Sequence, residues 1–227
     1  MHKVKILHTA YVTHNVKRFI VEKPREGYRF TPGQATEVAI NKPGWEDKKH
    51  PFTFTSLNDD LVLEFTIKGY DPKVYKNHEG VTWELHHLAP GDELLIDDPW
   101  GTIEYKGTGV FLAGGAGITP FIAIFRQLAK DGDLPGNKLI FSNKTALDVI
   151  LENELRALFS PQDLALTLTS EEIPGYEHGR IDENLIKKYV NDFSRPFYVC
   201  GPPPMLKALR DLLPTLGAQA EEIVFEK

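Results

Sequence analysis

The pattern of apolar residues changes near residue 105, and this change is the feature that most constrains the fold. Before residue 105, short β-rich runs are separated by turn clusters such as Thr31-Pro32-Gly33, whereas apolar runs alternate with helical stretches after it. The first pattern is typical of an antiparallel barrel, and the second of βαβ units around a mostly parallel sheet. We therefore predict two domains, residues 1–105 and 106–227.

The individual runs define the elements expected in both domains. In the first domain we predict one short helix over residues 81–88 and strands over residues 4–12, 16–21, 35–40, 52–55, 61–67 and 93–96. In the second we predict strands over residues 109–113, 138–142, 164–169, 197–200 and 223–225. Helices are predicted between these strands, over residues 120–130, 147–159, 182–190 and 203–213. Ligands of such sheets bind at the carboxyl ends of the strands, so a site is expected there.

Composition and charge exclude several classes of protein. The sequence is 41% hydrophobic and 26% charged and has no run of about 20 apolar residues, which predicts a globular, cytoplasmic protein that does not span a membrane. Its net charge of −6 argues against nucleic-acid binding. The single cysteine, Cys200, excludes an internal disulfide, a four-cysteine zinc site and a cysteine-ligated iron–sulfur cluster within these residues. We predict no metal site, and no feature calls for more than a monomer.

The segment 111–121 joins an apolar strand to a helix through a glycine-rich turn. Gly115 and Gly117 permit backbone conformations closed to other residues and let an anion approach the main chain. Thr119 is expected to cap the helix that follows, and Pro120 to lie in its first turn. Backbone N–H groups at that helix end would face a pyrophosphate. The turn is therefore either a phosphate cradle or a plain strand-to-helix turn.

Two further segments carry candidate functional residues. Cys200-Gly201-Pro202 follows a β-run, and its prolines are expected to hold the chain extended until a helix begins at Met205. A cysteine there is either a small buried hydrophobe or a functional thiol beside the nucleotide crevice. The segment 50–56 lies in the barrel half, where Phe52 is either a core residue or a ring face available for stacking.

These three segments, in this order and spacing, resemble the ferredoxin–NADP reductase superfamily of flavoproteins. In that family a barrel strand carries Arg-x-Tyr-Ser, the glycine turn reads Gly-x-Gly-x-x-Pro, and a later strand ends in Cys-Gly followed by prolines. The resemblance covers the whole chain. It implies a barrel that binds FAD, with FMN less expected, and an α/β domain that binds NADH or NADPH. The implied reaction is hydride transfer from the nicotinamide to the flavin.

The resemblance assigns roles to residues of the barrel. It implies that the isoalloxazine ring stacks on Phe52 and that Thr53 hydrogen-bonds near the redox-active nitrogen N5. His50 stands where the family has a phosphate-binding arginine, and neutral histidine lacks the bidentate fork of that side chain. Thr82 either donates to the flavin pyrophosphate or only caps the short helix. The other implied flavin contacts are Pro51, Ile67, Lys68, Gly80 and Val81.

In the second domain the resemblance assigns the nucleotide contacts and completes the predicted catalytic set. Glu226 matches a family glutamate close to the nicotinamide, although a short charged tail is the alternative. Thr53, Cys200 and Glu226 are the predicted catalytic residues, acting by positioning. Lys144 would favour the 2′-phosphate of NADPH, whereas Glu171 and Glu172 would repel it, which favours NADH. The implied nucleotide contacts are Gly115, Gly117, Ile118, Thr119, Pro120, Lys144, Arg180, Cys200, Gly201, Pro202 and Phe225.

Three functions are compatible with these features. The favoured one is an NAD(P)H-dependent reductase with bound FAD that passes electrons to a small redox protein such as ferredoxin, flavodoxin or an oxygenase component. The lack of cysteines for an internal iron–sulfur cluster supports it. A second is an NAD(P)H:flavin reductase that uses free flavin as substrate, which His50 in the arginine position favours. The third is a non-catalytic nucleotide-binding module, since fold alone does not fix function.

Overall fold

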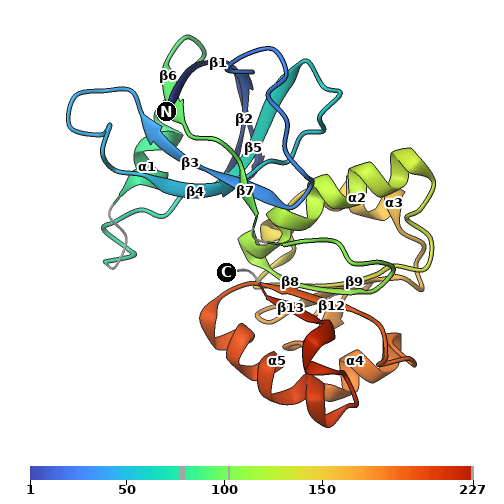
Figure 1. The fold of residues 1–227 in the computed structure, drawn as a ribbon. Helices are drawn as coiled ribbons and strands as arrows, with labels where there is room; N and C mark the ends of the chain where they lie inside the picture. The colour runs from blue at the N-terminus through green and yellow to red at the C-terminus, as the bar shows by residue number, and fades with distance from the viewer. Residues whose placement is uncertain (77–79, 102, 226–227) are drawn as a thin grey trace. The chain divides into compact units, whose positions relative to one another are not determined.

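The computed structural model describes residues 1–76, 80–101 and 103–225, and the chain divides into two compact units, Met1–Gly101 and Thr102–Lys227 (Figure 1). Each unit is built around its own sheet. Unit 1 has the predicted antiparallel architecture, and unit 2 has the predicted parallel sheet with helices. The sequence pattern placed the boundary between residues 105 and 106, slightly later than the division between the units.

Unit 1 is a closed antiparallel barrel with one short helix. Its strands hydrogen-bond in the order β4-β3-β6-β1-β2-β5, and β7 pairs with β3. An antiparallel bridge between Phe54 and Phe65 joins the two ends of this path, because Phe54 follows β4 and Phe65 lies in β5. The elements are β1 (His2–Thr13), β2 (Val16–Glu22), β3 (Gln34–Ile40), β4 (His50–Thr53), β5 (Val62–Lys68), α1 (Val81–His86), β6 (Glu93–Ile96) and β7 (Trp100–Gly101).

Aromatic side chains fill much of the barrel interior. Phe54 stacks on Phe30 with ring centroids 4.3 Å apart and lies tilted against Phe65 at 5.3 Å. Val81 and Leu85 of α1 belong to the same buried cluster. Truncation of a buried phenylalanine of this kind costs about 3–5 kcal/mol. This packing therefore fixes the positions of β4 and α1, the elements that carry the predicted flavin residues.

Unit 2 is a six-stranded parallel sheet in the order β11-β10-β9-β8-β12-β13. The strands are β8 (Val110–Gly114), β9 (Lys138–Asn143), β10 (Leu164–Leu168), β11 (Glu177–His178), β12 (Phe197–Cys200) and β13 (Ile223–Phe225). The α-helices are α2 (Thr119–Asp131), α3 (Glu152–Leu158), α4 (Glu183–Tyr189) and α5 (Pro203–Thr215). Short 3-10 helices are η1 (Gly115–Ile118), η2 (Ala146–Asp148) and η3 (Ala220–Glu222).

Helices cover both faces of this sheet, with α2 and α3 on one side and α4 and α5 on the other (Figure 1). Phe111 of β8 packs against Phe121 of α2, with ring centroids 5.0 Å apart. Val110 and Leu112, which alternate with Phe111, share a buried cluster with residues of α4 and α5. A strand covered on both faces needs apolar residues at every position. This burial explains why β8 reads as an uninterrupted apolar run.

The single helix predicted over residues 147–159 is wrong. The segment forms η2 and α3, separated by residues 149–151, of which Leu151 has a φ of 55° in the left-handed region. The backbone N–H and the hydroxyl of Thr145 both donate to Asp148 Oδ2, at 3.1 and 2.7 Å, and this capping box closes η2 as a separate turn. The sequence did not predict β7 and β11, because two-residue strands are too short to show alternation.

Candidate functional site

The glycine turn connects the carboxyl end of β8 to α2 through η1. Gly115 has a φ of +53°, and a Cβ at that position would meet no atom within 4 Å, so the space beside the turn is open. Pro120 lies in the first turn of α2, as predicted. The capping role predicted for Thr119 is wrong: η1 runs directly into α2 with Ile118 as the cap residue, and the Thr119 hydroxyl donates to the carbonyl of Ala116 at 3.0 Å.

The segment Cys200-Gly201-Pro202 lies against this turn. A Cβ on Gly117 would lie 2.4 Å from the carbonyl oxygen of Cys200 and 2.6 Å from the nitrogen of Gly201. A Cβ on Gly114 would lie 2.9 Å from Cδ of Pro202. These distances are too short for real side chains, so glycine at 117 lets backbone approach backbone, and glycine at 114 makes room for the Pro202 ring. Two segments that are distant in the sequence therefore form one surface.

The helix after this segment starts at Pro203, as the range 203–213 predicted. The expectation that all three prolines stay extended until Met205 is wrong, because only Pro202, with ψ of 148°, is extended, as the cap residue of α5. Proline suits the first turn of a helix, because an N–H at that position has no partner within the helix. Cys200, at the end of β12, is 2% exposed. The prolines therefore fix where β12 stops and α5 starts.

The two segments meet where the order of the strands reverses. From β8 the sheet extends through β9, β10 and β11 on one side and through β12 and β13 on the other. Ligands of open α/β sheets bind outside the carboxyl ends of the strands at such a switch point. The glycine turn follows β8 and Cys200 ends β12. The topology and the two sequence motifs thus indicate the same crevice.

The adjacent strand ends carry charged residues. The Ala146 N–H donates to Glu171 Oε2 at 2.8 Å, which fixes that carboxylate beside the end of β9. The Ser170 N–H donates to the carbonyl of Lys144 at 2.9 Å. The side chains of Lys144 and Arg180 are exposed. A fixed negative charge at this edge of the sheet opposes the binding of an additional phosphate.

In unit 1, β4 carries four of the predicted flavin residues. It pairs with β3, with Thr36 opposite Phe52. Pro51 is exposed, whereas His50 and Phe52 are half-buried, and Phe52 packs in part against the barrel core. Thr53 is 6% exposed, and its hydroxyl makes no hydrogen bond to another described residue. Such a hydroxyl is available to donate to a ligand.

The start of α1 brings together three more of the predicted flavin residues. Gly80 has a φ of +84° and occupies the cap position, and Val81 is buried in the barrel core. The capping role predicted for Thr82 is wrong, because Thr82 lies inside the first turn and its hydroxyl accepts from the Tyr70 N–H at 3.3 Å. The proton of that hydroxyl remains available to donate.

His86 joins the end of α1 to the end of β5. Its Nε2 lies 2.9 Å from the carbonyl oxygen of Ile67, and because a carbonyl only accepts, this nitrogen carries the proton. A Cβ on Gly69 would lie 2.9 Å from the His86 ring, so glycine makes room for it. Burial lowers the pKa of His86 below its ordinary value; the Ile67 bond opposes this shift, and the charge of Lys17 adds to it. The ring is therefore neutral at pH 7.

Lys17 closes the same end of α1. Its Nζ donates to the carbonyls of His86 and Leu88, at 3.1 and 2.7 Å. A positive charge at the carboxyl end of a helix complements the helix dipole. Burial lowers the pKa of Lys17, and the charge of Asp92 opposes that shift. Sequence reasoning did not identify Lys17 or His86, and it did not use the one local signal of close approach, a glycine at position 69 directly after the strand.

The predicted residues at the carboxyl terminus are only partly described. Phe225 ends β13 opposite Val199 of β12, and the guanidinium carbon of Arg210 lies 4.7 Å from the centre of its ring. Phe225 therefore packs within unit 2. Glu226 lies outside the described residues.

Asn143, the last residue of β9, was not predicted as a site residue. It is 5% exposed, and within the described part of the chain neither its Oδ1 nor its Nδ2 has a hydrogen-bond partner. The sequence did hold a signal, because a buried apolar run ends here in an amide side chain one strand away from the glycine turn.

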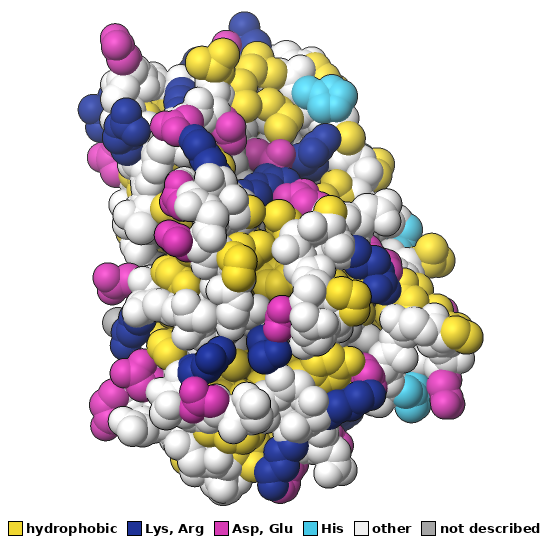
Figure 2. Space-filling model, turned by 90° about the vertical axis from the view of Figure 1, so that its right-hand side faces the viewer, with side chains coloured by type: hydrophobic (Ala, Val, Ile, Leu, Met, Phe, Trp, Pro, Cys, Tyr) yellow, Lys and Arg dark blue, Asp and Glu magenta, His cyan; other side chains and the backbone are white. Residues whose placement is uncertain are grey.

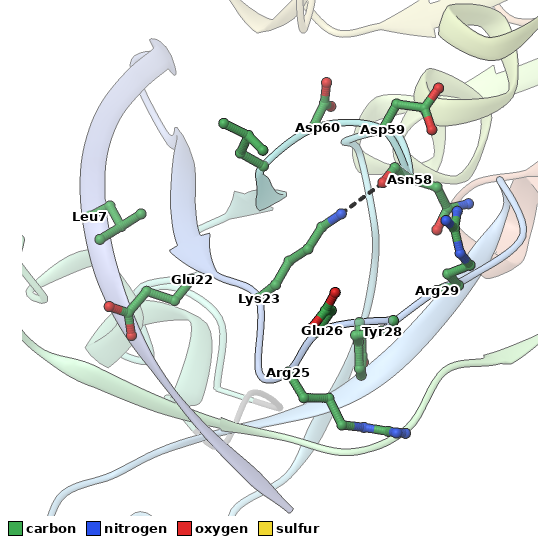
Figure 3. A pocket seen from close by; sticks show the side chains of 12 residues that line it. Leu7, Glu22, Lys23, Arg25, Glu26, Tyr28, Arg29, Asn58, Asp59 and Asp60 are labelled. Carbon is green, nitrogen blue, oxygen red and sulfur yellow. Dashed lines mark hydrogen bonds between the residues drawn. The ribbon is translucent and has the colours of Figure 1, made fainter.

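Unit 1 also has a hollow of about 710 Å³ that contains none of the predicted site residues (Figure 3). Side chains of both signs line it, among them Lys23, Arg29 and Asp59. Lys23 Nζ donates to the carbonyl of Asn58 at 2.7 Å. The face of the molecule in Figure 2 likewise shows acidic and basic side chains interspersed. Neither surface presents a field of one sign that would select a charged ligand.

The described residues contain no group of three or more His, Cys, Asp or Glu side chains placed to hold a metal ion. Within the same residues, the helices are all too short or too polar to cross a bilayer.

Two family models match the two parts of the chain. An FAD-binding domain matches residues 1–104, and an oxidoreductase NAD-binding domain matches residues 111–211. The chain is 28% identical to NADH-cytochrome b5 reductase 2 of Mycosarcoma maydis, covering 92% of this chain and 68% of that protein. It is 26% identical to the reductase component of propane 2-monooxygenase from Rhodococcus jostii, covering 88% and 56%. The chain thus spans between about half and two thirds of the lengths of these relatives.

Solved structures share the fold. The FAD/NAD-binding domain of a nitric oxide dioxygenase from Vibrio cholerae superposes with a TM-score of 0.86 at 19% identity, covering 99% of this chain and 97% of that one. A ferredoxin NADP⁺ reductase from Neisseria gonorrhoeae, solved with FAD and NADP bound, superposes with a TM-score of 0.82 at 21% identity, covering 99% and 97%.

The two units and their matches define an oxidoreductase that uses FAD and a nicotinamide nucleotide. Residues 1–104 belong to the FAD-binding domain family and residues 111–211 to the oxidoreductase NAD-binding domain family, and the fold is like that of a ferredoxin NADP⁺ reductase, as the sequence motifs predicted. The residues present fit both cofactors. The glycine turn has open space at Gly115 and close backbone packing at Gly117, and Thr53 and Asn143 carry polar atoms without partners among the described residues.

Proposed function

We propose that this oxidoreductase oxidises NADH, holds FAD on its barrel, and passes the electrons to a separate small redox protein. The observation that carries the proposal is the packing of Gly117 against Cys200 and Gly201 at the switch point of the parallel sheet. Ferredoxin, flavodoxin and an oxygenase component are the acceptors we favour. The name of the propane 2-monooxygenase relative supports an oxygenase component as the acceptor. The name of the cytochrome b5 reductase relative adds a b-type cytochrome to the candidate acceptors.

The residues of unit 2 act by binding and orienting the nucleotide. Gly115 and Gly117 let the main chain approach the pyrophosphate, assisted by the dipole of α2, which follows the cap residue Ile118 and begins with Thr119 and Pro120. We assign Cys200, Gly201 and Pro202 to the nicotinamide side, because they end β12, the other strand at the switch point. Glu226, outside the described residues, keeps its proposed positioning role near the nicotinamide.

The residues of unit 1 bind the flavin. FAD supplies hydride acceptance and single-electron release when bound. We propose that Phe52 stacks on the ring, that the unpartnered hydroxyl of Thr53 donates beside it, and that Thr82 donates its remaining proton to the pyrophosphate. The exposed Pro51, the strand end Ile67–Lys68, and Gly80 and Val81 at the start of α1 line the same site. His50 contributes less charge than the arginine it replaces.

We propose NADH rather than NADPH as the donor. The Glu171 carboxylate, held by the Ala146 N–H, lies at the strand ends to which we assign the adenosine half of the nucleotide. Lys144 and Arg180 are exposed there and carry the opposite charge. A Glu171→Gln variant is expected to raise kcat/KM for NADPH about tenfold with little change for NADH. An unchanged ratio of the two nucleotides would remove Glu171 from the explanation.

The decisive experiment is the absorption spectrum of the desalted protein together with NADH oxidation. A flavin spectrum that bleaches on adding NADH, with ferricyanide reduction and then reduction of a ferredoxin or cytochrome, supports the proposal. A colourless protein that reduces added riboflavin would instead establish the free-flavin reductase, the alternative that His50 favours. A His50→Arg variant then helps to separate the two, because it is expected to tighten FAD binding. A protein that binds FAD but never oxidises NADH would refute both.

A further inference from the structure

The carboxamide of Asn143 is a buried polar group that the packing of unit 2 leaves unexplained. Its residue is 5% exposed, and both Oδ1 and Nδ2 lack hydrogen-bond partners within the described residues. Burying an unpaired amide is unfavourable, so native proteins rarely retain one without a function. The other such atom among the described residues is Nε of Arg18, but that guanidinium has Nη1 3.8 Å from Glu64 and a side chain 36% exposed.

A second buried asparagine in the same unit shows the contrast. Asn137 is 1% exposed, and its Nδ2 donates to the carbonyls of Asp133 and Leu134, at 3.3 and 3.0 Å. Its Oδ1 accepts from the Gly109 N–H at 3.0 Å and from the Tyr105 hydroxyl at 3.3 Å. Asn137 is thus a fully satisfied part of the fold, whereas Asn143 has the same chemistry and no partner.

The position of Asn143 places its amide beside the nucleotide crevice. β9 pairs with β8 with Ser142 opposite Gly114, so Asn143 lies next to the first residue of the glycine turn. Ile140 belongs to the core shared with α4 and α5. Since side chains alternate along a strand, Asn143 is on the opposite face, which α2 and its preceding turn cover.

We infer that Asn143 is a nucleotide-binding residue whose carboxamide hydrogen-bonds the ribose or phosphate oxygens of the adenosine half. The inference rests on the proposed function. β9 lies on the other side of β8 from β12, which ends in Cys200, so the two halves of the dinucleotide extend to opposite sides of the glycine turn. One acceptor and two donors match the hydroxyls and phosphate oxygens of that half.

This role has a consequence that a structural role does not share. Replacing Asn143 by leucine, which has a similar shape, removes an amide that has no bond to lose. The ligand-free protein is then expected to be equally stable or more stable, while its affinity for the nucleotide falls. The matched Asn137→Leu variant loses four hydrogen bonds and is expected to be destabilised.

The test uses the full chain loaded with FAD and measures binding of NAD⁺, ADP-ribose and nicotinamide mononucleotide by calorimetry, with melting temperatures in the absence of nucleotide. For Asn143→Leu we expect Kd for NAD⁺ and ADP-ribose to rise about tenfold, equivalent to about 1.4 kcal/mol. Binding of nicotinamide mononucleotide is expected to stay unchanged, and the melting temperature to stay level or rise by about 2–4 °C. Asn143→Ala, whose smaller side chain cannot crowd its neighbours as leucine could, is expected to show the same loss of ADP-ribose affinity.

Two results would overturn the inference. Wild-type affinity in both variants combined with a lower melting temperature would make Asn143 a structural residue. A loss confined to nicotinamide mononucleotide would place it on the wrong half of the nucleotide. Failure of the wild-type protein to oxidise NADH or bind ADP-ribose would instead refute the proposed function. The two cases are distinguishable, because a failure of the inference shows only in the Asn143 variants, whereas a failure of the proposed function shows in the unmodified chain.

Discussion

Substitution of Gly117 by alanine tests the assembled nucleotide site most directly. The added Cβ would lie 2.4 Å from the carbonyl oxygen of Cys200, 2.5 Å from its carbonyl carbon and 2.6 Å from the nitrogen of Gly201. All three atoms are backbone, so no side-chain rotation relieves the overlap. Ordinary contact begins near 3.4 Å, and the turn must therefore separate from the end of β12 by about 1 Å.

This displacement has a cost in stability and a larger one in activity. Overpacking of this kind destabilises by about 1–3 kcal/mol. Misplacement of a reacting group by about 1 Å reduces the rate about 100-fold. We therefore expect kcat/KM for NADH, measured with ferricyanide as acceptor, to fall by about two orders of magnitude. FAD content, measured from the absorption spectrum, is expected to stay at the wild-type level because the flavin residues lie in unit 1.

A Gly132→Ala variant is the control. Gly132 ends α2 with a φ of +81°, and a Cβ there would meet nothing within 4 Å, so alanine adds backbone strain without a clash at the site. Its melting temperature is expected to fall while kcat/KM stays unchanged. Wild-type kcat/KM in Gly117→Ala would refute the reasoning, since it would show that the contact with Cys200 does not position the nucleotide.

Three further outcomes are expected. Thr53→Val removes the unpartnered hydroxyl and keeps the shape of the side chain. Flavin reduction by NADH, measured by stopped flow, should therefore slow about tenfold at unchanged FAD content, and an unchanged rate would exclude a role of Thr53 in hydride transfer. Cys200→Ala should lower kcat for NADH while ADP-ribose affinity is kept, and equal losses in both would indicate a packing effect. Burial lowers the pKa of His86 in the folded protein. The contribution of the neutral His86 ring to the free energy of unfolding is therefore fully present above about pH 6.5 and is lost as the pH falls through the folded pKa. Melting temperatures from pH 7.5 to 5 should therefore decline more steeply for the wild type than for His86→Gln. Parallel curves would show that His86 does not cause this pH dependence.

Periodic segments were predictable because burial repeats with the period of the element. β2 was expected over residues 16–21 and is Val16–Glu22, and β12 was expected over residues 197–200 and is Phe197–Cys200. The apolar period failed over residues 147–159, where Asp148 bonds back to Thr145 and ends the first turn. Periodicity reports which face is buried and does not report where the backbone turns.

Capping was less predictable than periodicity. Thr119 and Thr82 have the residue type that caps helices, yet Ile118 and Gly80 occupy the cap positions. In the first case a 3-10 turn leads straight into the helix, and in the second a glycine in the left-handed region precedes it. The partner of a hydroxyl therefore depends on how the chain enters the helix.

The sequence by itself determined the two-part architecture, the glycine turn and the family motifs, because these depend on local periodicity and on residues close together in the chain. Only the tertiary structure decided that Gly117 packs against Cys200, that His86 bonds to Ile67, and that Asn143 is buried without a partner among the described residues. Each of these depends on which distant segments become neighbours. Close approach and hydrogen-bond satisfaction are properties of packed pairs, and a single segment does not encode them.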